Sequence, residues 1–199
     1  MNKLILAAAL LLPQIGQAVT LNQYLKPVHA TLNQQLVDGD VANFGDSITQ
    51  RWKPQEGKKA PVNFAVGGSM SSDVIAKIDD TTNLCKAGNV QLLVGINDIA
   101  HGKYHQLITN LPILAAKLGC AKVTWIGILH PTRSDFTSDK HTFITKANGQ
   151  IKKFCGAMPN CTYVPPPQMI DSDYGDKLHP NASGYGKMKY LVDKYTGAR

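Results

Sequence analysis

Five short runs of apolar or β-branched residues recur along the chain, and amphipathic segments separate them. The runs cover residues 40–44, 61–66, 90–95, 122–129 and 161–164. Runs of this length are typical of buried strands. Strands that alternate with helices form a parallel sheet that right-handed crossovers cover on both faces. The pattern therefore predicts an α/β protein with a five-stranded parallel sheet.

The segments around these runs carry apolar residues at helical spacing. The first extends from Leu21 to Leu36, and Pro27 within it predicts a kink or a late helix start. Later amphipathic faces fall at residues 74–78, 107–118, 143–154 and 185–195. No internal repeat is found, and Pro165-Pro166-Pro167 is a stiff loop and not a domain linker. We therefore expect a single domain over residues 19–199.

Residues 1–18 have the pattern of a signal peptide. Lys3 gives a basic start, Leu4 to Leu12 form an apolar stretch, and Gly16-Gln17-Ala18 supplies small residues at the cleavage positions. The apolar stretch is shorter than the roughly 20 residues that cross a bilayer. We therefore expect a secreted or periplasmic protein, cleaved near Ala18 and without a membrane span.

Four cysteines in an exported chain predict disulfides. Cys155 and Cys161 enclose a short turn and are expected to pair. Cys85 and Cys120 each end a predicted helix just before a strand, so both lie at the amino edge of the sheet and form a second expected bridge. No C-x-x-C pair occurs, which argues against a zinc site.

The chain carries a formal net charge of +7. Such a protein is drawn to anionic surfaces such as cell envelopes or acidic polysaccharides. The lysines are scattered, however, which favours a role in solubility, and only Arg51, Lys53, Lys58 and Lys59 cluster. No zinc-finger, basic-helix or aromatic ribonucleoprotein motif is present, so nucleic acid is not an expected partner.

Polar or flexible residues follow several of the predicted strands directly. Ser47 follows the first strand, Gly67-Gly68 the second and Asn97-Asp98 the third, and Asp176 and His179 come after the fifth. In open parallel sheets, ligands bind beyond the carboxyl ends of the strands. Four separated segments therefore deliver their groups to the edge of the sheet where a site is expected.

Ser, Asp and His in this chain order form the pattern of an acyl-transfer triad. Ser47 is the expected nucleophile, and one ring nitrogen of His179 is its expected base. Asp176, three residues earlier, is expected to accept a hydrogen bond from the other ring nitrogen. Asp171 and Asp173 are rivals for the acid role, but only Asp176 has the three-residue spacing.

A tetrahedral intermediate needs hydrogen-bond donors aimed at its oxyanion. The sequence offers three candidates: the Ser47 amide at a helix start, a glycine amide from Gly67-Gly68, and the Asn97 side-chain amide. Each also has a purely structural explanation, because glycine and asparagine are common turn formers and serine a common helix cap.

Four blocks of this chain together resemble the SGNH (GDSL-type) hydrolases. They are Gly45-Asp46-Ser47-Ile48-Thr49, Asn63-Phe64-Ala65-Val66-Gly67-Gly68, Gly95-Ile96-Asn97-Asp98 and Asp176-Lys177-Leu178-His179-Pro180. The resemblance implies a three-layer α/β/α, flavodoxin-like fold and ester hydrolysis without a metal or other cofactor. It also implies Ser47 as nucleophile and Gly68 and Asn97 as oxyanion donors. Ser69 stands where the family often has aspartate, and Arg51 stands where it often has glycine. These two departures put the substrate preference in doubt.

The remaining histidines give no metal-binding pattern. His101 and His105 are expected to share a helix face, but no acidic residue with suitable spacing accompanies them, so a solvated helix start is favoured. His130 follows the fourth strand and is a candidate substrate contact, and His141 has no assigned role.

These features predict a serine esterase that removes small acyl groups from exposed substrates, either small molecules or acylated polysaccharides. An acyltransferase that uses the same acyl-enzyme and a non-catalytic surface-binding protein are the alternatives. A dinucleotide- or phosphate-binding protein is disfavoured, because neither a G-x-G-x-x-G nor a Walker loop occurs. The sequence specifies neither the natural ester nor the oligomeric state.

Overall fold

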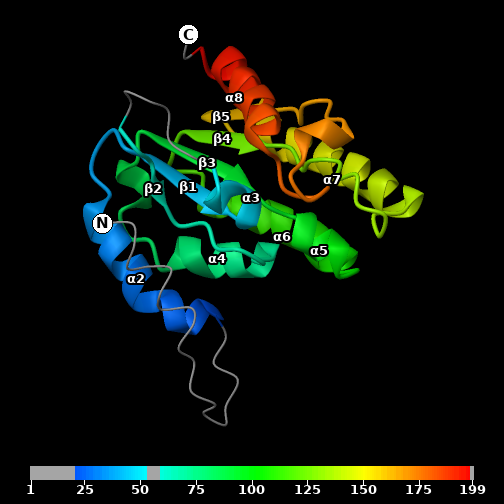
Figure 1. The fold of residues 1–199 in the computed structure, drawn as a ribbon. Coiled ribbons are helices and arrows are strands. Elements are labelled where there is room, and N and C mark those ends of the chain that lie inside the picture. The colour runs from blue at the N-terminus through cyan, green and yellow to red at the C-terminus, as the bar shows by residue number, and fades with distance from the viewer. Residues whose placement is uncertain (1–20, 53–58, 198–199) are drawn as a thin grey trace.

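The computed structural model describes residues 21–52 and 59–197, which contain a central five-stranded sheet (Figure 1). The strands are β1 (Val41–Gly45), β2 (Val62–Asn63), β3 (Asn89–Leu93), β4 (Val123–Ile126) and β5 (Cys161–Val164). Their order across the sheet is β2-β1-β3-β4-β5, and all neighbours are parallel. The predicted sheet is confirmed. The predicted signal peptide, residues 1–18, and Lys53 and Lys58 lie outside the described residues.

Helices cover the sheet on both faces and give three layers. They are α2 (Leu21–Gln35), α3 (Ser47–Gln50), α4 (Ser71–Asp79), α5 (Ile96–Ala100), α6 (Tyr104–Lys117), α7 (Ser138–Gly156) and α8 (Ala182–Thr196), with short 3-10 turns at Leu84–Lys86 and Asp171–Asp173. In Figure 1, α8 lies above the sheet while α4 and α6 lie below it. Within the described part of the chain, no helix is long and apolar enough to cross a membrane.

Strands β1 and β4 are buried along nearly their whole length because both faces of the sheet are covered. All four residues of β4 are buried, including Trp125. Phe44 of β1 stacks on Phe64 with ring centroids 4.8 Å apart. The second strand is shorter than the predicted run 61–66, although the amide of Phe64 still donates to the Asn43 carbonyl. The core thus forms where the apolar runs predicted it.

Both predicted disulfides are present. Cys85–Cys120 joins the turns that precede β3 and β4, and Cys155–Cys161 joins the end of α7 to the start of β5. Cys85, Cys120 and Cys155 each lie shortly before a strand, and Cys161 is the first residue of one. The bridges therefore tie together the amino edge of the sheet, opposite the predicted site.

The expectation that His101 and His105 share a helix face is wrong. The helix α5 ends at Ala100, and α6 begins only at Tyr104, so the two histidines lie on either side of a break. The ring of His101, which follows α5, instead contacts the backbone carbonyl of Asn97 in the first turn of that helix, with its Nδ1 2.8 Å from the oxygen. Among the described residues, no group of three or more potential ligands is arranged to hold a metal ion.

Candidate active site

A tight strand-to-helix turn carries Ser47 to the carboxyl edge of the sheet. A Cβ atom at Gly45 would lie 2.2 Å from the Leu93 carbonyl oxygen, so only glycine fits where β1 passes β3. Asp46 then caps α3, and its Oδ1 accepts a hydrogen bond from the Ile48 amide at 2.9 Å. Ser47 is the first residue of α3 and is half-buried. Its hydroxyl therefore sits at a fixed, accessible position.

The hydroxyl of Ser47 lies at one end of a hydrogen-bonded relay. The Nε2 atom of His179 is 2.8 Å from Ser47 Oγ, and its Nδ1 atom is 2.6 Å from Asp176 Oδ2. An ionised carboxylate only accepts, so Nδ1 carries the proton that points at Asp176. This leaves Nε2 free to accept the proton of Ser47. The structure thus brings the three predicted residues together in the predicted order.

The loop that holds Asp176 and His179 is fixed by its backbone. Asp176 Oδ1 accepts hydrogen bonds from the amide of His179 at 2.7 Å and from that of Leu178 at 3.1 Å. Lys177 adopts a left-handed conformation with φ 62°, which is uncommon for a residue with a side chain. Its carbonyl accepts from the amides of Thr132 and Arg133 in the loop after β4. A strained turn held from outside is typical of a preorganised site.

Of the three candidate aspartates, only Asp176 contacts the histidine. Burial raises the pKa of Asp176, but hydrogen bonds from the backbone and ring of His179 and from Leu178 outweigh it and hold the pKa at about 2. Asp173 instead accepts from Lys187 at 2.7 Å and from Ser183 at 2.8 Å, which fixes the start of α8. Asp171 is exposed. Asp176 is therefore ionised throughout the neutral range and available to orient His179.

The predicted oxyanion donors lie on three separate segments. The Ser47 amide is the first of α3, where a helix leaves its amides without partners inside the helix. Gly68 is exposed and has φ +78°, a conformation that favours glycine. The neighbouring amide of Gly67 is engaged, because it donates to Gln50 Oε1 at 2.9 Å. Of the two predicted glycines, Gly68 is thus the candidate donor.

The Asn97 carboxamide has a fixed orientation. Its Nδ2 donates to the Ser69 carbonyl at 3.0 Å. A side-chain amide has two N–H donors, so the second remains for a ligand. The next residue, Asp98, is buried and accepts from both the amide and the hydroxyl of Ser71, which ties α5 to α4. The Asn-Asp pair therefore combines an open donor with a structural anchor.

A buried charged group that the sequence analysis missed lies below these donors. Lys77 of α4 is 3% exposed, and its Nζ donates to Ser69 Oγ at 2.5 Å. Burial lowers the pKa of Lys77 to about 8, while burial of Asp46 raises the pKa of that carboxyl to about 7. One signal was available: Lys77 follows Val74 by three residues and so lies on the inward face of the helix.

Ser69 and Arg51, which differ from the residues often found in SGNH hydrolases, have different surroundings. Ser69 is buried and accepts the hydrogen bond from Lys77. Arg51 follows α3 at the surface, and its Nη1 is 3.9 Å from Asp176 Oδ2, with both side chains about half exposed. The charge of Arg51 thus lies at the open side of the relay.

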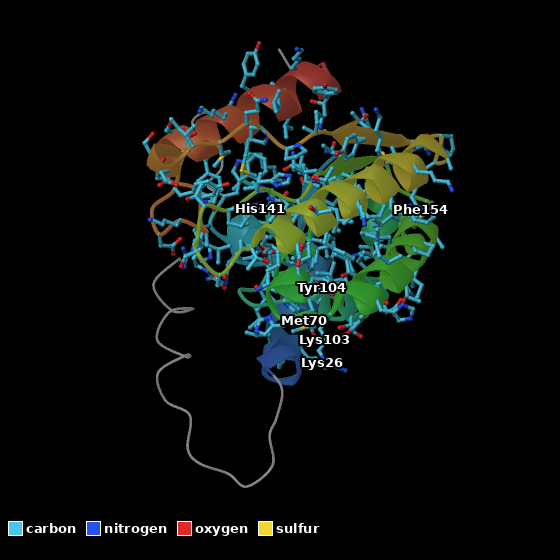
Figure 2. The ribbon with its side chains drawn as sticks, turned by 90° about the vertical axis from the view of Figure 1, so that its right-hand side faces the viewer. Lys26, Met70, Lys103, Tyr104, His141 and Phe154 are labelled. Atoms are coloured by element: carbon cyan, nitrogen blue, oxygen red, sulfur yellow. A yellow bond between two sulfur atoms is a disulfide. The ribbon has the colours of Figure 1, made fainter. Side chains whose placement is uncertain are left out.

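His130, the candidate substrate contact, pairs with another histidine. Its Nδ1 is 3.1 Å from Nδ1 of His141, and the two rings stack with centroids 5.4 Å apart. His141 lies on α7, as labelled in Figure 2. Burial and the neighbouring His141 ring both lower the pKa of His130. Its carbonyl accepts from the Tyr174 hydroxyl at 2.7 Å, which ties the loop after β4 to the start of the His179 loop.

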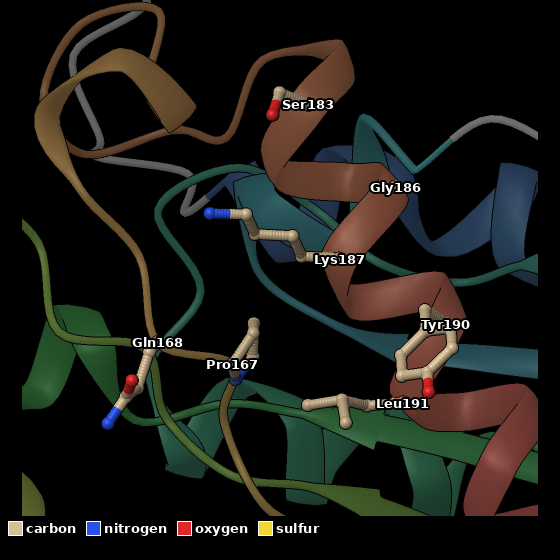
Figure 3. Close-up of a pocket in the computed structure, with 7 residues that line it drawn as sticks. All are labelled: Pro167, Gln168, Ser183, Gly186, Lys187, Tyr190 and Leu191. Carbon is tan, nitrogen blue, oxygen red and sulfur yellow. The ribbon is translucent and has the colours of Figure 1, made fainter.

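A cavity of about 450 Å³ opens elsewhere, between α8 and the loop after β5 (Figure 3). Its lining residues are Pro167, Gln168, Ser183, Gly186, Lys187, Tyr190 and Leu191. None of the three relay residues lines this cavity. The relay therefore opens at the edge of the sheet and not into this cavity.

The arrangement of the sheet and helices is similar to that of solved structures that include a GDSL-like lipase and acetyl xylan esterases. Similar solved structures include a protein from Streptococcus pneumonia provisionally described as a platelet activating factor (19% identity, 87% of this chain and 92% of that one, TM-score 0.73). A GDSL-like lipase from Bacteroides thetaiotaomicron has 17% identity, coverage of 87% and 98%, and a TM-score of 0.64. A mutant of an acetyl xylan esterase from Geobacillus stearothermophilus has 14% identity, coverage of 82% and 97%, and a TM-score of 0.65.

At these identities the likeness shows a shared fold. No protein-family model matches the sequence, and no curated protein matches it. The evidence for its chemistry therefore comes from the arrangement of its own side chains.

Proposed function

We propose that this chain is an exported serine esterase of the SGNH (GDSL-type) family, with Ser47, His179 and Asp176 as its catalytic triad. The observation that carries the proposal is the continuous relay, with 2.8 Å between Ser47 and His179 and 2.6 Å between His179 and Asp176. Structures with the same fold include a GDSL-like lipase and acetyl xylan esterases, which supports ester hydrolysis. The two disulfides support export, because such bridges persist in oxidising compartments.

The proposed reaction begins with proton transfer from Ser47 Oγ to His179 Nε2, while Oγ attacks the ester carbonyl carbon. The carbonyl oxygen becomes an oxyanion that accepts hydrogen bonds from the amides of Ser47 and Gly68 and from Asn97 Nδ2. His179 then donates its proton to the departing alkoxide, which leaves an acyl-serine. A water molecule then attacks the acyl carbon while His179 takes its proton, and His179 passes that proton to Ser47 Oγ as the C–Oγ bond breaks and the acid leaves. Asp176 stabilises the imidazolium in both halves of the reaction.

The proposed substrates carry small acyl groups on a larger, exposed molecule such as an acetylated polysaccharide. Asp176 and Arg51 are each about half exposed beside the relay, so the site is open on that side. The cavity beside α8 is not lined by relay residues and so offers no acyl tunnel to the proposed nucleophile. Rates on aryl esters should therefore be highest for acetyl or propionyl groups, and a maximum at long acyl chains would contradict this substrate class.

The direct test compares hydrolysis of a short-chain aryl ester by the wild type and by Ser47→Ala. The variant should lose activity by about 10⁶-fold, the scale seen when the nucleophile of a serine hydrolase is removed. Ser138→Ala is the matched control, because Ser138 is an exposed serine at the first position of α7. Equal activity of Ser47→Ala and the wild type would eliminate the proposed nucleophile.

Hydrolysis and acyl transfer share the same acyl-enzyme and differ only in the acceptor. Incubation of the enzyme with an aryl acetate and a sugar acceptor, followed by product analysis, separates the two. We expect free acetate as the main product. Acetylated sugar as the main product would make the protein an acyltransferase with the same catalytic residues.

A further inference from the structure

The turn Val66–Ser69 carries two features of the proposed oxyanion site. It contains Gly68, whose amide is a proposed donor, and the Ser69 carbonyl, which orients the Asn97 carboxamide at 3.0 Å. The Ser69 amide closes the turn by donating to the Val66 carbonyl at 3.1 Å. A shift of this one turn would displace two of the three proposed donors together.

Few contacts hold the turn on its outer side. A Cβ atom placed on Gly68 would meet nothing within 4 Å, so the space on that side of the residue is open. Gln50 Oε1 accepts from the Gly67 amide, but Gln50 is itself exposed at the end of α3. The turn therefore needs an anchor from the interior of the protein.

Lys77 provides that anchor. Ser69 is 4% exposed and Lys77 is 3% exposed, so their 2.5 Å hydrogen bond is shielded from water. A hydrogen bond from a charged donor is about twice as strong as one between neutral groups. The ionisable groups that face Lys77 are Asp73 on its own helix, Asp46 at the start of α3, and His29 on α2. The two aspartates offset the cost of burying the ammonium group.

We propose that Lys77 is a positioning residue for the oxyanion site, acting through the Ser69 side chain on the turn that holds Gly68 and orients Asn97. This inference rests on the proposed esterase function. The ammonium group touches neither the substrate nor the relay. It holds the Ser69 hydroxyl, and the Ser69 backbone then sets the positions of both donors. Its loss should therefore weaken stabilisation of the transition state and leave substrate binding largely unchanged.

The test measures kcat and KM of Lys77→Met, Ser69→Ala and the double variant on a short-chain aryl ester. Methionine keeps most of the length of lysine but cannot donate a hydrogen bond. Each single variant should lose about 10-fold in kcat, and its KM should stay within about twofold of the wild-type value. The loss in kcat is smaller than the roughly 10²-fold cost of misplacing a catalytic group by about 1 Å, because the turn keeps its other contacts. The double variant should lose no more than the worse single variant, because both changes remove the same bond.

Rates are expressed per active site, titrated with a serine-directed organophosphate, so that misfolded protein does not count. Lys146→Met, a change at an exposed lysine on α7, is the matched control and should keep the wild-type kcat. Should Lys77→Met fail to fold, Ser69→Ala still tests the bond from its other end.

Three results would overturn the inference. The first is an unchanged kcat per titrated site in the variants. The second is losses that multiply in the double variant, because the two residues would then act separately. The third is a wild type inactive on esters, which removes the proposed function and this inference with it. An active wild type and an inactive Ser47→Ala would uphold the proposed function whatever the Lys77 variants do.

Discussion

The two disulfides should contribute unequally to stability, because they close loops of very different length. Cys85 and Cys120 are separated by 35 residues, and Cys155 and Cys161 by 6. The chain-entropy relation for cross-linked loops gives about 4 kcal/mol for the long loop and about 2 kcal/mol for the short one. Cys85 and Cys120 are exposed, so their replacement by alanine removes the cross-link with little loss of packing.

Urea unfolding of the two double-alanine variants measures these contributions. The variant at Cys85 and Cys120 should lose about 4 kcal/mol of unfolding free energy relative to the wild type. In the other variant, Cys155 is 1% exposed, so some loss of core packing adds to the loss of the cross-link. A long-loop variant that is as stable as the wild type, with an unchanged dependence on urea, would refute the reasoning.

Two further predictions concern aspartates near the relay. Asp176→Asn should lower kcat by about 10²- to 10⁴-fold, because it alters the acceptor that fixes the His179 tautomer, and Asp171→Asn, at the exposed rival, should leave kcat unchanged. A kcat for Asp176→Asn within twofold of the wild type would exclude Asp176 from the triad. Asp46 has a folded pKa of about 7 and an ordinary value of 3.8, so its protonated form stabilises the fold. That contribution is complete below about pH 4 and falls by up to about 1.4 kcal/mol per pH unit until pH 7. Urea unfolding between pH 4 and 8 should show this decline in the wild type and a weaker one in Asp46→Asn, and identical profiles would contradict the buried-acid explanation.

The order of strands and helices was predictable because each strand overlaps a run rich in apolar or β-branched residues. A strand that is buried on both faces does not alternate between apolar and polar residues, so it stands out from the polar loops around it. All four residues of β4 are buried in this way. The break between α5 and α6 was not predictable from spacing, since His101 and His105 have helical separation. Gly102 lies in the left-handed region there with φ +69°, and the chain turns at that point.

The relay was predictable because its members lie at strand ends or three residues apart on one loop. Parallel topology sends every strand end to the same edge, so Ser47 and His179 meet although 132 residues separate them. The support beneath the oxyanion site was not predictable. Lys77 meets Ser69 only through the way α4 packs under the turn, and the sequence shows only a lysine on an apolar face.

Covalent labelling shows whether Ser47 is a nucleophile that His179 activates. The wild type is treated with a fluorophosphonate, digested, and analysed by peptide mass spectrometry. We predict one adduct, on Ser47, that forms about 10²- to 10⁴-fold more slowly in His179→Ala, the range expected for loss of a general base. An adduct on a different residue, or equal labelling rates with and without His179, would contradict this prediction.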